Sequence, residues 1–176
     1  MRRGGRKGSA IVEFAMTGIP LMFVWISIVQ MALGMWHYHT LQYASKMGGV
    51  YLQTHGHDYC ISPGNTCTIS TVAQVIANNA IGMLPSQITA TFTPYDLNGN
   101  VGTAVTCSPL TACQTGGASA STQWFPTGYD FQTCQFTIKL EYQFNSALAM
   151  VAPGNGVVRF ANSYWFPAFT HQTIIF

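Results

Sequence analysis

A long apolar run over residues 8–36 constrains this chain more than any other feature. Its only charged residue is Glu13. The run is preceded by four basic residues, Arg2, Arg3, Arg6 and Lys7. About 25 residues of α-helix rise by roughly 38 Å, which is long enough to cross the hydrocarbon core of a bilayer with some tilt. The sequence therefore predicts a transmembrane helix over residues 9–36.

The positions of the basic residues predict the orientation of this helix. No further lysine or arginine follows until Lys46. Because basic flanks stay in the cytoplasm, we expect a cytoplasmic N-terminus and an exported remainder. A cleaved secretory signal is the alternative, but its apolar region spans only about 7–15 residues and an internal acidic residue is atypical. Glu13 can also be explained locally, by a shallow position from which it reaches Arg6 or Lys7.

The residues around Glu13 resemble the processing site of type IV prepilins. The segment GSAIVEF covers residues 8–14. In that family a prepilin peptidase cuts after the glycine, so that the glutamate becomes the fifth residue of the mature chain. The resemblance implies cleavage between Gly8 and Ser9 and removal of residues 1–8 as a basic leader. It also implies that Glu13 of one subunit compensates the new Ser9 amine of a neighbour as the helices pack.

The resemblance narrows to the TadE-like proteins, the pseudopilins of tight-adherence (Flp) pilus systems. The residues that carry it are Val12, Glu13, Phe14, Ala15 and Pro20. It implies a minor pilin that is processed by a prepilin peptidase and used in pilus assembly and surface adherence, with Glu13 and Phe14 acting in subunit assembly. The implied partners are the peptidase, other pilins, inner-membrane assembly proteins and the membrane itself. The implied location is the bacterial inner membrane, with the C-terminal domain periplasmic, or extracellular in the assembled pilus.

The rest of the chain is expected to form one exported domain. The first helix is predicted to continue over residues 37–53 as a stalk and to weaken at Gly48-Gly49, which leaves residues 54–176 for the domain. A second helix is predicted over residues 71–84, with Ser70 or Thr71 as its cap and Gln74 as the capping-box partner of Thr71. Its apolar face is expected to be core.

Alternating patterns predict the strands of this domain. Residues 88–93 alternate apolar residues with threonines, and an Asn98-Gly99 turn follows. Residues 134–144 alternate most regularly, and residues 157–166 are predicted as the last strand. Residues 101–133 show little pattern. These elements predict an α+β, pilin-like fold with a long N-terminal transmembrane and stalk helix, a second short helix and a small antiparallel sheet.

Five cysteines lie beyond the membrane run and are disulfide candidates in an oxidising compartment. Cys60 and Cys67 flank a Ser-Pro-Gly-Asn turn, and Cys107 and Cys113 bracket a short loop. Cys134 is then left over, or it pairs with Cys107 or Cys113. The sequence does not choose between these connectivities.

Other functional classes are disfavoured. The loop around His55, His57, Asp58 and Cys60 lacks the spacing of a closed zinc site, so no metal or cofactor is expected, although a metal or redox sensor is a third hypothesis. The five acidic residues are scattered and no catalytic motif is present, so the chain is not expected to be an enzyme. Loss of the four leader charges lowers the formal net charge from +2 to −2, which leaves no basic patch for nucleic acid.

The second functional hypothesis is a single-pass, membrane-anchored periplasmic binding module that does not polymerise. Its contacts would come from the aromatic stretches 124–126 (Trp-Phe-Pro) and 164–166 (Tyr-Trp-Phe). Core packing is the expected role of these aromatic residues.

Overall fold

A computed structural model describes residues 7–55, 68–115, 133–145 and 163–175. The chain divides into two compact units, which are described separately. One unit comprises Met1–Met35 and Asn145–Asn162, and the other comprises Trp36–Phe144 and Ser163–Phe176. Helix α1 (Lys7–Thr54) contributes its first part to the former and its last part to the latter.

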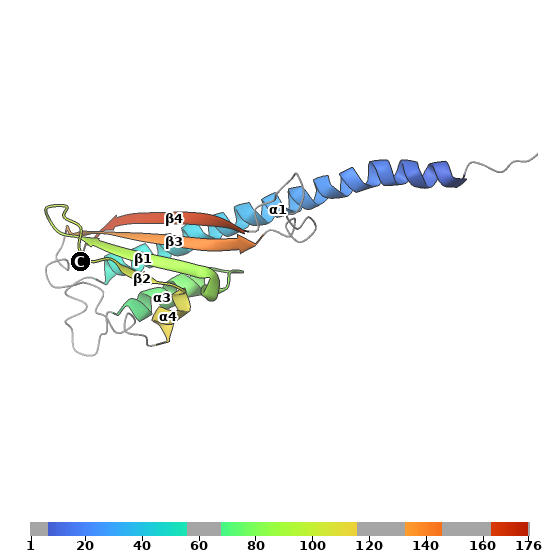
Figure 1. The fold of residues 1–176 in the computed structure, drawn as a ribbon. Coiled ribbons are helices and arrows are strands. Elements are labelled where there is room, and N and C mark those ends of the chain that lie inside the picture. Colours follow the sequence, from blue (N-terminus) through green and yellow to red (C-terminus); the bar gives the residue numbers. More distant parts are fainter. Residues whose placement is uncertain (1–6, 56–67, 116–132, 146–162, 176) are drawn as a thin grey trace, which may run out of the picture. The chain divides into compact units, whose positions relative to one another are not determined.

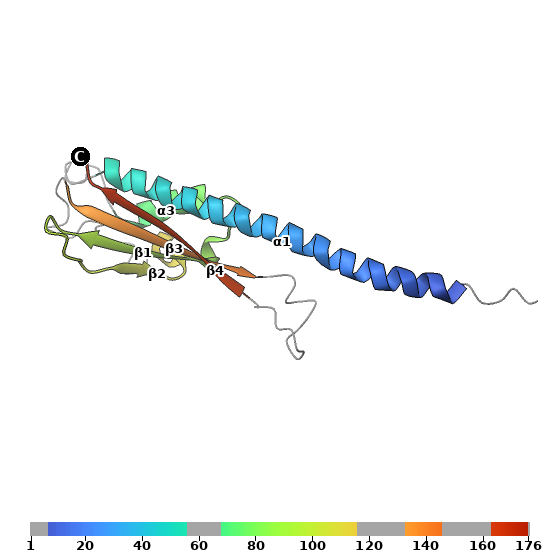
Figure 2. The ribbon, with the colours of Figure 1, turned by 90° about the horizontal axis from the view of Figure 1, so that it is seen from above.

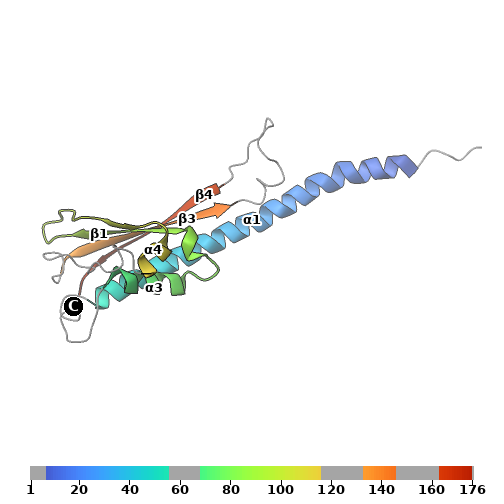
Figure 3. The same cartoon turned by 60° about the horizontal axis from the view of Figure 1, so that its bottom comes forward.

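The second unit is an antiparallel sheet covered by helices on one face. The sheet has four strands in the order β2-β1-β3-β4. The strands are β1 (Ile88–Tyr95), β2 (Val105–Cys107), β3 (Gln135–Asn145) and β4 (Ser163–Thr173). The helices are the last part of α1, α3 (Ile69–Asn79), the 3-10 turn η1 (Pro85–Gln87) and α4 (Leu110–Gln114). Within this unit, α1 and α3 lie on the same side of the sheet (Figures 1, 2 and 3). The expected α+β class is confirmed.

The two central strands form where the alternating patterns predict them. In β1 buried and half-buried residues alternate along the whole strand, and β3 follows the same rule from Phe136 to Tyr142. The two strands pair antiparallel, with Ala90 opposite Leu140 and Phe92 opposite Ile138. Because successive side chains point to opposite faces of a sheet, this register places the apolar residues of both strands on the face that meets the helices.

The predicted second helix begins and ends earlier than expected. The N-cap is Thr68 and not Ser70 or Thr71, and no side chain caps the helix. The capping box with Gln74 is therefore wrong, because Thr71 and Gln74 both lie within the helix. The helix ends at Asn79, and the chain then turns through Gly82 at a φ of +80°, a conformation that glycine adopts readily. The buried face is largely as predicted.

Residues 101–115 carry structure that the sequence pattern did not reveal. Strand β2 pairs with β1, with Ala90 opposite Cys107. Helix α4 follows, and a disulfide joins Cys107 to Cys113 with the Cα atoms 5.7 Å apart. Of the three pairings considered for Cys107, Cys113 and Cys134, the local one between Cys107 and Cys113 is confirmed. Cys134 is fully buried in the core, and Cys60 and Cys67 lie outside the described residues.

Strand β4 lies further along the chain than predicted. The expected strand over residues 157–166 is wrong in its end, since β4 runs from Ser163 to Thr173, and residues 157–162 lie outside the described part. The strand passes through Pro167 and continues with Ala168 and Thr170 buried and Phe169 and His171 exposed. Each face of this second half mixes polar and apolar residues, so apolar alternation in the sequence does not reveal the strand.

The glycine pair Gly48-Gly49 does not weaken α1, contrary to the expectation from sequence. A Cβ atom on Gly48 would lie 2.7 Å from Ile76 Cγ1, and one on Gly49 would lie 2.6 Å from Thr170 Cγ2. Real Cβ atoms do not approach carbon so closely, because close-packed interiors leave no such space. The two glycines therefore let α1 approach α3 and β4 closely.

The turn predicted at Asn98-Gly99 is present and is organised by Asp96. Asp96 Oδ1 accepts hydrogen bonds from the backbone N–H groups of Asn98 (2.8 Å) and Asn100 (2.7 Å), and Oδ2 accepts one from Asn100 Nδ2 (2.7 Å). Gly99 supplies the positive φ of +80°. The hydrogen bonds from Asn100, side chain first, hold the pKa of Asp96 below its ordinary 3.8.

We expect Asn100→Ala to raise the pKa of Asp96 toward 3.8. A lowered pKa in the folded state means that ionised Asp96 stabilises the fold above pH 3.8 and that this contribution is lost as the pH falls through the lowered pKa. The measurement is an NMR titration of the Asp96 carboxyl carbon in the full chain. The control is Asn79→Ala, which removes a different asparagine side-chain bond, to Val75 O, and should leave the titration unchanged. An unaltered Asp96 titration in Asn100→Ala would contradict the assignment.

Candidate functional site: the N-terminal helix

The first part of α1 presents apolar side chains on all sides. Ile11, Phe14 and Met16 are each more than 70% exposed, and no residue in the most apolar 18-residue window is buried. Exposed apolar surface of this extent is unfavourable in water. By length and composition the helix can cross a membrane, and it is consistent with a single-pass anchor.

The hydroxyl groups in this part of the helix are satisfied by the helix itself. Thr17 Oγ1 donates to the backbone oxygen of Glu13 at 2.9 Å, and Ser27 Oγ donates to that of Phe23 at 2.8 Å. Bonds to the preceding turn remove the cost of placing a hydroxyl among lipid tails. Both polar residues are therefore compatible with a membrane environment.

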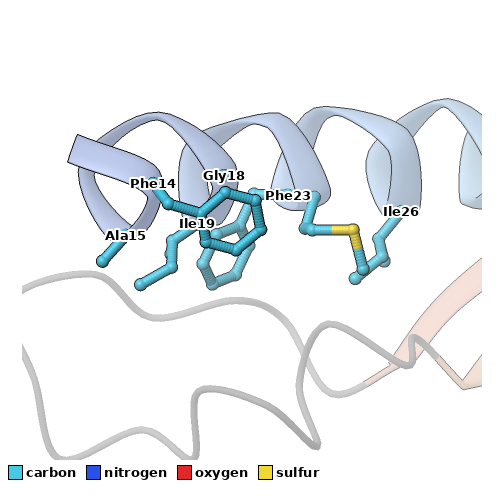
Figure 4. A pocket seen from close by; sticks show the side chains of 7 residues that line it. Phe14, Ala15, Gly18, Ile19, Phe23 and Ile26 are labelled. Atoms are coloured by element: carbon cyan, nitrogen blue, oxygen red, sulfur yellow. The ribbon is translucent and has the colours of Figure 1, made fainter. Parts of the chain in front are cut away.

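One side of the helix carries an apolar groove, shown in Figure 4. The residues that line it are Phe14, Ala15, Gly18, Ile19, Met22, Phe23 and Ile26. The Phe14 ring lies over Gly18, where an added Cβ would be 3.7 Å from its edge. A small residue beside large ones makes a surface into which a second helix can pack closely.

Glu13 lies on another side of the helix from this groove. At 100° per residue, Glu13 and Thr17 share one face, while the lining residues centre on the opposite one. Glu13 is exposed there. The two predicted assembly residues, Glu13 and Phe14, therefore mark different faces of the same helix. The predicted cleavage position, Gly8 and Ser9, lies in the first turn of α1.

In the globular unit, α1 is joined to the sheet by aromatic contacts near its start. The His37 ring stacks on Tyr142 with the centroids 5.3 Å apart and lies 5.4 Å from Phe144. Tyr142 donates a hydrogen bond to Gln87 Oε1 at 3.2 Å, and burial raises the pKa of the Tyr142 phenol. These contacts connect the first turns of this part of α1 to β3.

The remaining predicted site residues are dispersed. Among the described residues, no three His, Cys, Asp or Glu side chains form a metal-binding group, and His57, Asp58 and Cys60 lie outside them. The His55 ring stacks on Tyr51 at 4.0 Å. Residues 124–126 also lie outside the described residues. Core packing was the wrong expectation for Tyr164 and Trp165, which are 47% and 54% exposed, whereas Phe166 packs on the core.

A second groove was not foreseen from sequence. It has a volume of about 410 Å³ and is bounded by α1 and β4. The residues that line it are Gln42, Tyr43, Lys46, Phe169, Thr170, His171 and Gln172. Lys46 is the only charged residue in the part of α1 that belongs to the globular unit, which was the signal in the sequence, but only the tertiary structure brings β4 beside it.

The N-terminal part of the chain matches a known protein family. The family model described as "TadE-like protein" matches residues 8–49, which covers the first part of α1 and ends in the glycine pair. No curated protein and no solved structure matches the chain. The matched residues carry the apolar groove, Glu13 and the glycine pair Gly48-Gly49, which packs against α3 and β4 within the globular unit. The N-terminal residues 8–49 of this chain are thus similar to the TadE-like family.

Proposed function

We propose that this protein is a minor pilin, or pseudopilin, of a tight-adherence (Flp) type IV pilus. The observation that carries the proposal is the TadE-like match over a helix that is apolar on all sides and holds a single carboxylate, Glu13. TadE-like proteins are pilin-type structural proteins, and the proposed role is structural and not catalytic. The pilus serves surface adherence.

In this proposal the chain has four parts. Residues 1–8 are a leader that a prepilin peptidase removes, residues 9–36 span the inner membrane, residues 37–53 extend the helix outside it, and residues 54–176 form the exported domain. The leader carries all four basic residues of the N-terminus, which hold that end in the cytoplasm until cleavage.

Two faces of the helix then act in assembly. An ionised carboxylate within a membrane helix costs on the order of 2.5–3.5 kcal/mol on insertion scales. A neighbour's Ser9 amine, created by cleavage, offsets this cost because opposite charges attract strongly where water is excluded. The groove around Phe14 and Gly18 receives an adjacent helix, and other pilins and inner-membrane assembly proteins are the partners.

Mass spectrometry of the native N-terminus tests this function. We expect the mature chain purified from membranes to begin at Ser9. A mature chain that begins at Met1 would contradict the proposal and would favour the membrane-anchored binding module that does not polymerise.

We expect Gly8→Leu to abolish processing almost completely, because a side chain at the residue before the cut would obstruct the peptidase. The readout is a full-length band that persists in membrane fractions. Gly5→Leu, a matched change within the same leader, should be processed normally. Normal mobility and normal pili in Gly8→Leu would count against cleavage at this bond.

A further inference from the structure

Among the described strands none pairs with the outer side of β4, so β4 forms an open edge of the described sheet. The strand order places β2 at one edge and β4 at the other. The Ile174 N–H donates to Cys134 O at 2.9 Å, and the Thr133 N–H donates to Ile174 O at 3.1 Å, with Thr133 at a φ of 75°. This is the geometry of a bulge at the start of β3, and it sets Ile174 opposite Cys134.

Two side-chain contacts show that the same register continues along β4. Counting back from Ile174 along β4 and forward from Cys134 along β3, one residue at a time, places His171 opposite Thr137 and Phe169 opposite Lys139. The Thr137 hydroxyl lies 2.8 Å from His171 Nδ1, and Lys139 Nζ lies 5.9 Å from the centre of the Phe169 ring. The pairing is therefore regular through Phe169.

This register determines which backbone groups point away from the sheet. In an antiparallel pair, the N–H and C=O of alternate residues face the partner strand and those of the residues between face the other way. Ile174 faces β3, so the backbone groups of Phe169 and His171 face the open edge. Pro167 falls on the same alternation, which places its missing N–H at the edge, where proline is tolerated.

The open edge borders the groove between β4 and α1. Helix α1 packs beneath β4 through a buried hydrogen bond of 2.7 Å from Ser45 Oγ to Thr170 Oγ1. The flank of α1 that carries Gln42, Tyr43 and Lys46 then forms one wall, and residues 169–172 form the other. A helix beside an unpaired strand edge is an arrangement that admits an extended peptide.

The charge of the groove comes from Lys46. Its side chain is exposed and forms no ion pair with any residue in the described part of the chain. Lys139, in contrast, is paired with Glu141 at 2.8 Å. The Asp96 carboxylate accepts hydrogen bonds from Asn100 within its own turn. The groove therefore presents a positive charge that a carboxylate from another chain would complement.

We propose that the groove between α1 and the edge of β4 binds an extended, acidic segment of a different protein, which adds to the sheet as a fifth strand. The backbone groups of Phe169 and His171 pair with the segment, and Lys46 meets its carboxylate. This site lies within the globular unit and does not depend on processing or on the pilus role.

A second copy of this chain is a poorer occupant. Two β4 edges paired antiparallel about a twofold axis would bring the same surface of each copy together. The two Lys46 ammonium groups would then flank the same junction, and like charges placed opposite each other are destabilising. An acidic strand from another protein would instead place a carboxylate beside the Lys46 ammonium group.

The test is peptide binding to the full chain in detergent micelles. The probes are fluorescent nine-residue peptides of alternating threonine and valine, with glutamate, glutamine or lysine at the centre. We expect the glutamate peptide to bind about twofold to fivefold tighter than the glutamine peptide, as exposed ion pairs do, and the lysine peptide to bind most weakly. Binding of the glutamate peptide should also slow hydrogen exchange at the amides of Phe169 and His171.

Two pairs of variants separate the contribution of the Lys46 charge from that of the backbone hydrogen bonds. Lys46→Gln should remove the preference for glutamate, whereas Lys139→Gln should retain it. Phe169→Pro, which lacks the outward N–H, should bind at least tenfold more weakly than Phe169→Ala, which keeps it. The comparison of peptides and the Lys46 variant decide the question even if Phe169→Pro does not fold. Equal affinity for the glutamate and lysine peptides, or two copies that associate through β4 without peptide, would overturn the proposal.

Discussion

Glu13→Ala is expected to leave processing intact but to reduce incorporation of the protein into pili by about a hundredfold or more. Removing one partner of a buried ion pair costs about 3–5 kcal/mol, because the other charge is left uncompensated. In the assembly proposed here, that remaining charge is the Ser9 amine of the neighbour. The measurement is the amount of processed protein in sheared pilus fractions relative to the membrane fraction.

Two controls make this result specific to the charge at this position. Glu13→Gln keeps the shape of the side chain and should show nearly the same loss, which would exclude packing as the cause. Glu141→Ala removes a partly exposed carboxylate paired with Lys139 on β3 and should leave incorporation within about twofold of the wild type, as surface ion pairs contribute little. Wild-type levels of Glu13→Ala in pili would refute the proposed role.

Gly48→Leu is expected to lower the free energy of unfolding of the globular unit by about 3 kcal/mol. A Cβ at this position already lies 2.7 Å from Ile76 Cγ1 and 3.5 Å from Ile138 Cδ1, so a larger side chain must separate α1 from α3 and the sheet. Overpacking typically costs about 1–3 kcal/mol and occasionally more. For a unit of this size the midpoint of thermal unfolding should fall by roughly 10–20 °C, as measured by near-UV circular dichroism in detergent.

Matched variants test the cause. Val50→Leu enlarges an exposed residue on the same helix and should change stability by less than about 0.5 kcal/mol. Ile76→Ala should make room for the new methyl group in Gly48→Ala, so that the double variant is more stable than the sum of the two single changes predicts. If Gly48→Leu unfolds at the wild-type temperature, the close approach at Gly48 does not limit the packing.

The periodic and apolar segments of this chain could be predicted from sequence alone. The membrane-length helix follows from an uninterrupted apolar run, and strands β1 and β3 follow from alternation over at least six residues. The turn at Asn98-Gly99 follows from residues that tolerate a positive φ. Each of these signals is local, because the residues that carry it also form the element.

Other features depended on partners distant in the chain. Gly48 and Gly49 read as weak helix formers by propensity, yet α3 and β4 pack against them at distances that no other residue allows. Strand β2 and helix α4 are too short to carry a period, and they are held by β1 and by the Cys107–Cys113 disulfide.

The candidate sites divide in the same way. The position of Glu13 in an apolar helix is visible in the sequence, and so is the basic leader before it. That Glu13 and Phe14 lie on different faces follows from the helix itself. The groove beside Lys46, however, exists only because β4 ends the sheet next to α1. The sequence by itself determined which segments bury apolar surface, since burial is encoded residue by residue. Only the tertiary structure decided which edges and charges those segments leave exposed, since that depends on which elements meet.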